Sequence, residues 1–421
     1  MQVKIEPIKP SGTVSAIASK SDAHRAIICA ALADKKTNIY ISHISNDIEA
    51  TLNCIKGIGA DFTKKNNAYV ITPVNPPLQN PILDCNESGS TLRFLLPVIS
   101  ALGSGATFIG SGRLPERPMG LIVDLLKEHG NTFSSSKLPI TVSGKTKGGI
   151  FTIAGNVSSQ FISGLLFALP LLKDDSIIKL SSSLQSAAYV NMTVCTLKRF
   201  GVNIKQSERE FVINQKDSYT SPKEYVVEGD WSNAAFFMAL GAIGGKVTIK
   251  NLNLNSNQSD KILLEVLSLA GVNYTISNDE ITVEKSEIKP FSFDVSGCPD
   301  LFPILSVLAC GAKGKSTLYN AERLRIKESD RIKTTKELIL KLGGKAEEAS
   351  DSLTVYGSGK LSGGTVESFN DHRIAMSAFA ASAICENEVI LKDAKAIDKS
   401  YPSFIEDFIS IGGKVNVITD R

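Results

Sequence analysis

Nine cationic side chains of this sequence stand at the beginnings of expected helices or in the loops beside them. They are Lys20, Arg25, Arg93, Arg113, Arg117, Lys327, Arg331, Arg373 and Lys399. An arginine can hold a carboxylate or phosphate through two hydrogen bonds, and a lysine supplies a movable point charge. A helix start adds unpaired backbone N–H groups and the positive end of the helix dipole. A single arginine is more often a solvated surface residue, but this repeated placement indicates a site for a ligand with several negative charges.

Two carboxylates lie within this basic setting. Glu328 belongs to the charged segment 323–331, just ahead of an expected helix from Ile332 to Leu342, and Asp300 stands at another expected helix start. An acid among cations can be a salt-bridge partner. It can also be a proton carrier whose pKa is tuned by its neighbours. The residues alone leave both interpretations open.

The cations recur because the chain repeats one design. A polar loop that opens a helix is centred at Ser21, Gly89, Ser159, Trp231, Asp300 and His372, in steps of 68, 70, 72, 69 and 72 residues. Helix-closing glycines stand at Gly59, Gly130, Gly201, Gly271, Gly343 and Gly412, in steps of 71, 71, 70, 72 and 69 residues. Two independent markers with one period predict six copies of a single supersecondary unit. The hydrophobic pattern of each copy favours the order β-α-β-α-β-β.

Local signals predict where individual elements begin. The first helix should include residues 26–32, and a second helix should begin near Ser45 and run towards Gly59. Pro118 is expected at the first position of a helix that continues to Glu128. Ser186 should open the helix that ends at Gly201.

Length and composition describe a globular protein of two domains. The 421 residues are 43% apolar and 21% charged, with a formal net charge of +3. Six units of about 70 residues are too many for one core, so three units in each domain are expected, joined by the polar segment 218–224. The mild charge does not indicate nucleic acid or a membrane surface as a partner.

The cysteines indicate a reducing compartment. There are seven, an odd number without a C-x-x-C pair, so neither disulfides nor a zinc site is expected. The four histidines are scattered, and no metal site is expected. The first residues lack an apolar signal core, and a cytoplasmic location is expected.

Several segments together resemble one family of enzymes. They are Ser19–Ser21 with Arg25, Gly89–Arg93, Gly110–Arg113, Glu116–Pro118, Ser158–Phe161, Arg325–Arg331, Asn370–Arg373, and Lys399 with Pro402. In this order and over essentially the full length they closely resemble the 5-enolpyruvylshikimate-3-phosphate synthase family of enolpyruvyl transferases. The resemblance implies an α/β fold, a two-domain inside-out α/β barrel of six β-α-β-α-β-β repeats. One domain would span 13–225, and the other would comprise 1–12 with 226–421.

The resemblance also implies the activity. The family transfers the enolpyruvyl group of phosphoenolpyruvate to the 5-hydroxyl of shikimate 3-phosphate and releases phosphate, in the shikimate pathway of aromatic amino acid biosynthesis. It needs no cofactor and no metal, and it is inhibited by glyphosate. Shikimate 3-phosphate, phosphoenolpyruvate and glyphosate are therefore the expected small-molecule partners of a cytoplasmic monomer.

Site residues are implied by the matched motifs. Those for shikimate 3-phosphate are Lys20, Ser21, Arg25, Ser158, Ser159, Gln160, Ser186, Tyr189, Asp300 and Lys327. Those for phosphoenolpyruvate are Lys20, Gly89, Arg113, Gln160, Arg331, Arg373 and Lys399. Asp300, Glu328 and Lys20 would be catalytic, with Asp300 accepting the hydroxyl proton and Glu328 delivering and retrieving the methyl proton. Since these residues come from both domains, the site is expected to be completed only when the two halves close.

Two positions depart from the family pattern. Glu87 and Arg323 stand where many members have asparagine. Glu87 adds a carboxylate near the expected anion site, so the local contacts there stay open, as does a ligand role for Arg323.

Two other functions compete with this interpretation. The sister enolpyruvyl transferase that acts on UDP-N-acetylglucosamine usually carries a reactive cysteine in the loop that corresponds to 106–118, and this loop has none. A six-unit ring could also be a DNA sliding clamp, which would bind duplex DNA in a salt-dependent manner. A clamp would have a general basic lining instead of acids paired with bases at helix starts.

Overall fold

The computed structural model describes residues 1–66 and 68–418 and has a mixed α/β fold. The chain forms two compact units. Unit 1 comprises Met1–Ile17 with Glu228–Arg421, and unit 2 comprises Ala18–Val227. Each unit has its own hydrophobic core. No helix in the described part of the chain has both the length and the apolar character needed to cross a membrane.

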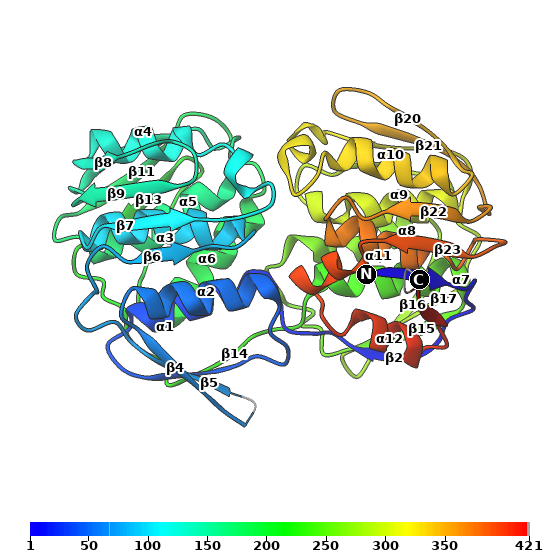
Figure 1. Cartoon of the computed structure of the whole chain (residues 1–421), viewed down its shortest axis with the longest axis horizontal. Coiled ribbons are helices and arrows are strands. Elements are labelled where there is room, and N and C mark those ends of the chain that lie inside the picture. The colour runs from blue at the N-terminus through cyan, green and yellow to red at the C-terminus, as the bar shows by residue number, and fades with distance from the viewer. Residues whose placement is uncertain (67, 419–421) are drawn as a thin grey trace. The chain divides into compact units, whose positions relative to one another are not determined.

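Six four-stranded sheets are described, three in each unit (Figure 1). Unit 2 has β14 (Glu224–Val226)-β3 (Thr37–Tyr40)-β5 (Ala68–Thr72)-β4 (Asp61–Lys65), β6 (Ile82–Asp84)-β7 (Ala106–Ile109)-β9 (Ile140–Gly144)-β8 (Asn131–Phe133), and β10 (Gly149–Ile153)-β11 (Ser176–Leu180)-β13 (Glu210–Ile213)-β12 (Lys205–Gln206). Unit 1 has β2 (Ser11–Ser15)-β15 (Lys246–Lys250)-β17 (Glu280–Glu284)-β16 (Asn273–Ser277), β18 (Ser292–Asp294)-β19 (Lys313–Tyr319)-β21 (Leu353–Ser358)-β20 (Lys345–Glu348), and β22 (Gly364–Glu367)-β23 (Val389–Lys392)-β1 (Gln2–Ile5)-β24 (Val415–Ile418). In every sheet, read in this order, the first two strands are parallel and the later neighbours are antiparallel.

Within the described residues, twelve α-helices connect these strands, six in each unit. Those of unit 2 are α1 (Lys20–Leu32), α2 (Asn46–Gly57), α3 (Gly89–Leu102), α4 (Gly120–Glu128), α5 (Ser159–Ala168) and α6 (Ala187–Arg199). Those of unit 1 are α7 (Trp231–Gly244), α8 (Leu263–Leu269), α9 (Phe302–Cys310), α10 (Arg331–Lys341), α11 (His372–Ala381) and α12 (Phe404–Ser410). The odd-numbered helices are buried along almost their whole length, whereas the even-numbered ones alternate buried and exposed residues. A helix that is apolar all round requires such enclosure, and α7 and α9 are the clearest examples.

The six marker glycines close helices, as the sequence predicts. Each stands two residues beyond the end of an even-numbered helix, and each has a positive φ, from 73° at Gly271 to 105° at Gly59. Glycine adopts this left-handed conformation without a steric penalty, so it ends a helix readily.

Two predicted helix starts need correction, and those at Ser45 and Ser186 are confirmed. The first helix begins at Lys20 and not near Ala26, because the Ser19 side chain accepts a hydrogen bond from the Asp22 N–H and caps it. Helix α4 begins at Gly120, so Pro118 lies outside it. Ser45 does cap α2, as expected.

The strand just before each passage of the chain from one unit to the other belongs to the unit that the chain is leaving. β2 precedes α1 in the sequence but pairs with β15, and β14 precedes α7 but pairs with β3. β14 begins at Glu224, the last residue of the segment expected to be a linker. In unit 1 the strand β1 lies between β23 and β24, so the first and last strands of the chain are neighbours (Figure 1).

Candidate active site

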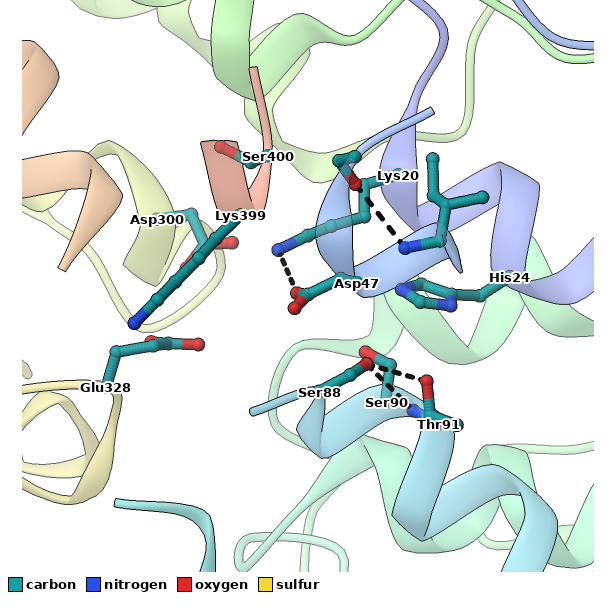
Figure 2. Close-up of polar contacts among 12 residues, drawn as sticks. Lys20, His24, Asp47, Ser88, Ser90, Thr91, Asp300, Glu328, Lys399 and Ser400 are labelled. Carbon is teal, nitrogen blue, oxygen red and sulfur yellow. Dashed lines mark hydrogen bonds and ion pairs between the residues drawn. The ribbon is translucent and has the colours of Figure 1, made fainter. Parts of the chain in front are cut away.

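In unit 2, the start of α1 carries two of the expected cations. Lys20 is the first residue of this helix, and its Nζ lies 2.7 Å from Asp47 Oδ2, in the first turn of α2 (Figure 2). Arg25 lies one turn further and is buried. Its guanidinium donates to Ser21 O (2.6 Å), Tyr189 O (2.8 Å) and Thr193 Oγ1 (2.9 Å). Arg25 therefore fixes the start of α1 to α6 and brings three of the predicted residues together.

The starts of α3 and α5 are linked by a second group. Arg93 Nη1 donates to Gln160 Oε1 (2.8 Å), and Gln160 Nε2 donates to Ser90 Oγ (2.9 Å). Gly89 is the first residue of α3, and a Cβ there would lie 2.6 Å from Arg117 Nη1 and 3.0 Å from Arg93 Nη1. Two guanidinium groups thus approach the backbone at Gly89.

Arg113 pairs with a carboxylate of its own loop. Its side chain is exposed, and its Nε is 3.4 Å from Glu116 Oε2. In unit 2 it is therefore Arg117, and not Arg113, that the structure brings against Gly89.

The expected phosphate-binding serines stand at two helix starts. Ser158 is the N-cap of α5, and Ser159 is its first residue. Ser186 is the N-cap of α6, is buried, and has a φ of 53°. A left-handed conformation at a residue other than glycine costs free energy and is concentrated at functional sites. Tyr189 follows Ser186 by one helical turn.

In unit 1, Arg331 is the centre of the candidate site. It is the first residue of α10 and only 1% of its side chain is exposed. Its guanidinium donates to Asp300 Oδ1 (2.7 Å), Glu328 Oε2 (2.8 Å) and Asp371 Oδ2 (2.9 Å). Because these three carboxylates surround it, the pKa of Arg331 is raised despite its burial. Both predicted proton carriers therefore contact one guanidinium.

Asp300 is held among three cations. Arg373 Nη2 donates to its Oδ2 (2.9 Å), Arg331 bonds its Oδ1, and Lys327 Nζ is 3.9 Å from Oδ1. Burial favours the neutral acid, but these charges outweigh it and hold the pKa of Asp300 well below its usual range. Asp300 is thus a carboxylate.

For the pKa of Lys327, burial outweighs the charge of the neighbouring carboxylate. Its burial opposes the ammonium form, and the attraction of Asp300 compensates only in part, so its pKa is lowered to about 8. Lys399 ends the 3₁₀ helix η6 (Ala394–Lys399), and its Nζ donates to Asn370 O at 2.5 Å. Figure 2 draws Lys399 together with Asp300 and Glu328, the two carboxylates that Arg331 joins.

Sequence reasoning missed three carboxylates of these groups. Asp371 caps α11 and accepts hydrogen bonds from Arg331 and Ser329; it lies within a segment that carried the family resemblance, so the signal was present. Asp47 lies in the first turn of α2, where many helices of this chain carry polar residues, so nothing in the sequence distinguishes it as a site residue. Asp260 had no signal at all. Its carboxylate accepts a bond from Ser232, and burial followed by the charge of Asp300 raises its pKa to about 6.

The site residues of unit 2 and those of unit 1 form two sets that can bind anions and carry protons. Each combines buried guanidinium groups with an ammonium group, and unit 1 adds carboxylates with different electrostatic surroundings. Within residues 1–66 and 68–418, no three His, Cys, Asp or Glu side chains are arranged to hold a metal ion.

Comparisons with known proteins agree on one family. The model of the family "EPSP synthase (3-phosphoshikimate 1-carboxyvinyltransferase)" matches residues 5–408. A 3-phosphoshikimate 1-carboxyvinyltransferase of Clostridium kluyveri is 42% identical over 418 residues, 98% of each chain. The protein of that name from Brachyspira hyodysenteriae is 41% identical over 419 residues, 99% of this chain and all of the relative. Among solved structures, EPSP synthase of Acinetobacter baumannii is similar with a TM-score of 0.84 and 25% identity, over 99% of this chain and 100% of that one.

Proposed function

This chain belongs to the EPSP synthase (3-phosphoshikimate 1-carboxyvinyltransferase) family, and on that premise we propose which of its residues act on the two substrates. It transfers the enolpyruvyl group of phosphoenolpyruvate to the 5-hydroxyl of shikimate 3-phosphate and releases phosphate, a step of aromatic amino acid biosynthesis. The observation that carries the assignment is the group of Arg331, Asp300 and Glu328, because it combines an anion-binding cation with both proton carriers.

The two substrates share residues of both units in this proposal. Shikimate 3-phosphate is held by Lys20, Ser21, Arg25, Ser158, Ser159, Gln160, Ser186, Tyr189, Asp300 and Lys327. Phosphoenolpyruvate is held by Lys20, Gly89, Arg113, Gln160, Arg331, Arg373 and Lys399. The hydrogen bonds of Arg25 to Ser21 and Tyr189 support the first set, and the two guanidinium groups at Gly89 support an anion there.

Substrate binding would adjust the basicity of Asp300. In the free protein its cations make it a very weak base, which is unsuited to accepting a hydroxyl proton. When the anionic substrates share the charges of Arg331, Arg373 and Lys327, Asp300 is less strongly stabilised as a carboxylate. Its pKa then rises towards a useful range. Glu328, on the other side of Arg331, is the carrier of the methyl proton.

The finer architecture is also part of the proposal. Each unit is an inside-out α/β barrel of three β-α-β-α-β-β repeats, with the odd-numbered helices inside and the three sheets outside. The near-complete burial of those helices and the common strand order of the six sheets support it. We further propose a cytoplasmic monomer; the six buried, unbridged cysteines suit a reducing compartment.

Release of inorganic phosphate tests the function. The purified chain should release phosphate only when phosphoenolpyruvate and shikimate 3-phosphate are both present, and UDP-N-acetylglucosamine should not replace the latter. Glyphosate should inhibit in competition with phosphoenolpyruvate. Phosphate release with UDP-N-acetylglucosamine alone as acceptor would assign the sister activity instead.

Lys327 provides a test through pH. Since its pKa is lowered to about 8, affinity for shikimate 3-phosphate should fall as the pH rises above that value and the ammonium charge is lost. The free energy of unfolding should change in the opposite direction. Between about pH 8 and 10.4 the unfolded chain binds more protons than the folded one, so this group stabilises the fold increasingly as pH rises.

Titration calorimetry at several pH values measures the binding part. Lys327→Arg keeps the charge throughout this range, so its affinity should be nearly constant from about pH 7 to 9.5. A parallel decline in the wild type and in Lys327→Arg would remove Lys327 from the shikimate 3-phosphate site.

A further inference from the structure

Two polar contacts join α1 to α2 in unit 2, one helical turn apart. The outer contact is the ion pair of Lys20 and Asp47. The inner one joins His24 Nδ1 to Thr51 Oγ1 at 2.6 Å. Residues four apart lie on the same face of a helix, so His24 stands directly behind Lys20 and Thr51 directly behind Asp47. Unlike the outer pair, the inner pair has no exposed surface.

The inner contact continues to the start of α3. Thr51 Oγ1 is 2.7 Å from Thr91 Oγ1, and the Thr91 hydroxyl donates to Ser88 Oγ at 2.7 Å. Ser88 is the N-cap of α3, and its Oγ also accepts from the Thr91 backbone N–H at 3.2 Å. Figure 2 shows the two bonds between Thr91 and Ser88, and it also shows the ring of His24, which extends from α1. A buried chain of hydrogen bonds therefore runs from α1 through α2 to the residue before Gly89.

Counting protons along this chain determines the form of His24. Each threonine hydroxyl has one proton. Thr91 uses its proton on Ser88, so it must accept from Thr51; Thr51 has then used its own proton and must accept from His24. The Nδ1 atom therefore carries a hydrogen, and Nε2 is the bare nitrogen. Burial, with the charges of Lys20 and Arg25, lowers the pKa of His24 well below its usual value, so the ring is neutral.

We propose that His24, as its Nδ1–H tautomer, is a positioning residue that holds Ser88 and the Gly89 start of α3 in register with Lys20. This inference rests on the proposed function, in which Lys20 and Gly89 both contact phosphoenolpyruvate. A fully formed chain of hydrogen bonds restricts the rotamers of all its members, and such support of a site by groups behind it improves the geometry of binding. His24 itself touches no substrate.

Thr51→Val tests the chain, because valine has nearly the same shape and lacks the hydroxyl. The substitution removes both hydrogen bonds of the Thr51 hydroxyl, and we expect the KM for phosphoenolpyruvate to rise about tenfold, as much as one buried hydrogen bond typically contributes. The KM for shikimate 3-phosphate and the kcat should change less than about twofold. Thr51→Ser keeps a hydroxyl at this position, so its KM for phosphoenolpyruvate should stay near the wild-type value.

A matched control separates positioning from stability. Ser100 lies in α3, the helix that begins at Gly89. It is as buried as Thr51, and its hydroxyl donates to the Leu96 carbonyl one turn back. Ser100→Ala removes a buried hydroxyl of α3 that belongs to no such chain, so it should leave both KM values unchanged whatever its effect on the melting temperature. If Thr51→Val and Ser100→Ala have the same kinetic constants, His24 is an ordinary core histidine and the proposal is wrong.

The tautomer is measurable in the unaltered protein. Nitrogen-15 NMR distinguishes a protonated ring nitrogen from a bare one, and His24→Asn identifies the signals of His24 among those of the four histidines. We expect a hydrogen on Nδ1 and none on Nε2; a hydrogen on Nε2 would reverse the chain and overturn the proposal. If the wild type releases no phosphate with both substrates, the proposed function fails, whereas the NMR result still decides the direction of the chain.

Discussion

Glu328→Gln is expected to lower kcat by about 10²–10⁴-fold, the contribution typical of a positioned proton carrier. Glutamine keeps the size of the side chain and an oxygen that can accept from Arg331, now 2.8 Å from the Glu328 carboxylate. It cannot take up or deliver a proton. Shikimate 3-phosphate should therefore bind nearly as tightly as before, which equilibrium titration would measure beside the rate of phosphate release.

A control in the neighbouring helix makes this result specific. Glu337 of α10 is partly exposed and pairs with Lys341 at 2.9 Å. Glu337→Gln removes the same charge outside the site, and such a surface pair contributes little free energy. Its kcat should stay within about twofold of the wild type. A Glu328→Gln enzyme with unchanged kcat would reduce Glu328 to a salt-bridge partner of Arg331.

Asp371→Asn should lower the free energy of unfolding strongly. Asp371 is fully buried and accepts from the buried Arg331 guanidinium and from the Ser329 hydroxyl. Removing one member of a buried ion pair leaves the other charge uncompensated, which typically costs about 3–5 kcal/mol in the free energy of unfolding. Urea unfolding of the two proteins measures the difference. Because Asp300 and Glu328 also bond Arg331, a loss below about 1 kcal/mol would mean that these two carboxylates are sufficient.

Helix ends and repeats were predictable because they depend on short segments. The Ser45 cap of α2 and the glycines two residues beyond six helices follow from local backbone chemistry. The sequence pattern predicts too late a start for α1, because Lys20 and Asp22 resemble the residues of a polar loop. Polar residues are common in the first helical turn, where the apolar pattern has not yet begun.

The site was predictable where a motif carried it and otherwise was not. Arg331, Glu328 and Lys327 are close in the sequence, and a family resemblance could identify them. Asp260 is 40 residues from Asp300, and its raised pKa depends on burial and on that one neighbour. Charge–charge distances of this kind arise from tertiary packing. The preference for Arg117 over Arg113 beside Gly89 likewise depends on the path of one loop.

The position of β1 has a consequence for the order in which the chain can fold during synthesis. Unit 2 possesses all its strands once Val226 has been made, since β14 is the last strand it requires. The first strand of the chain pairs Val3 with Leu391 and with Val417, so it waits for nearly the entire length to be translated. Contacts of such sequence separation form slowly. The N-terminal residues of unit 1 therefore remain unpaired on the ribosome while the whole of unit 2 can already be native.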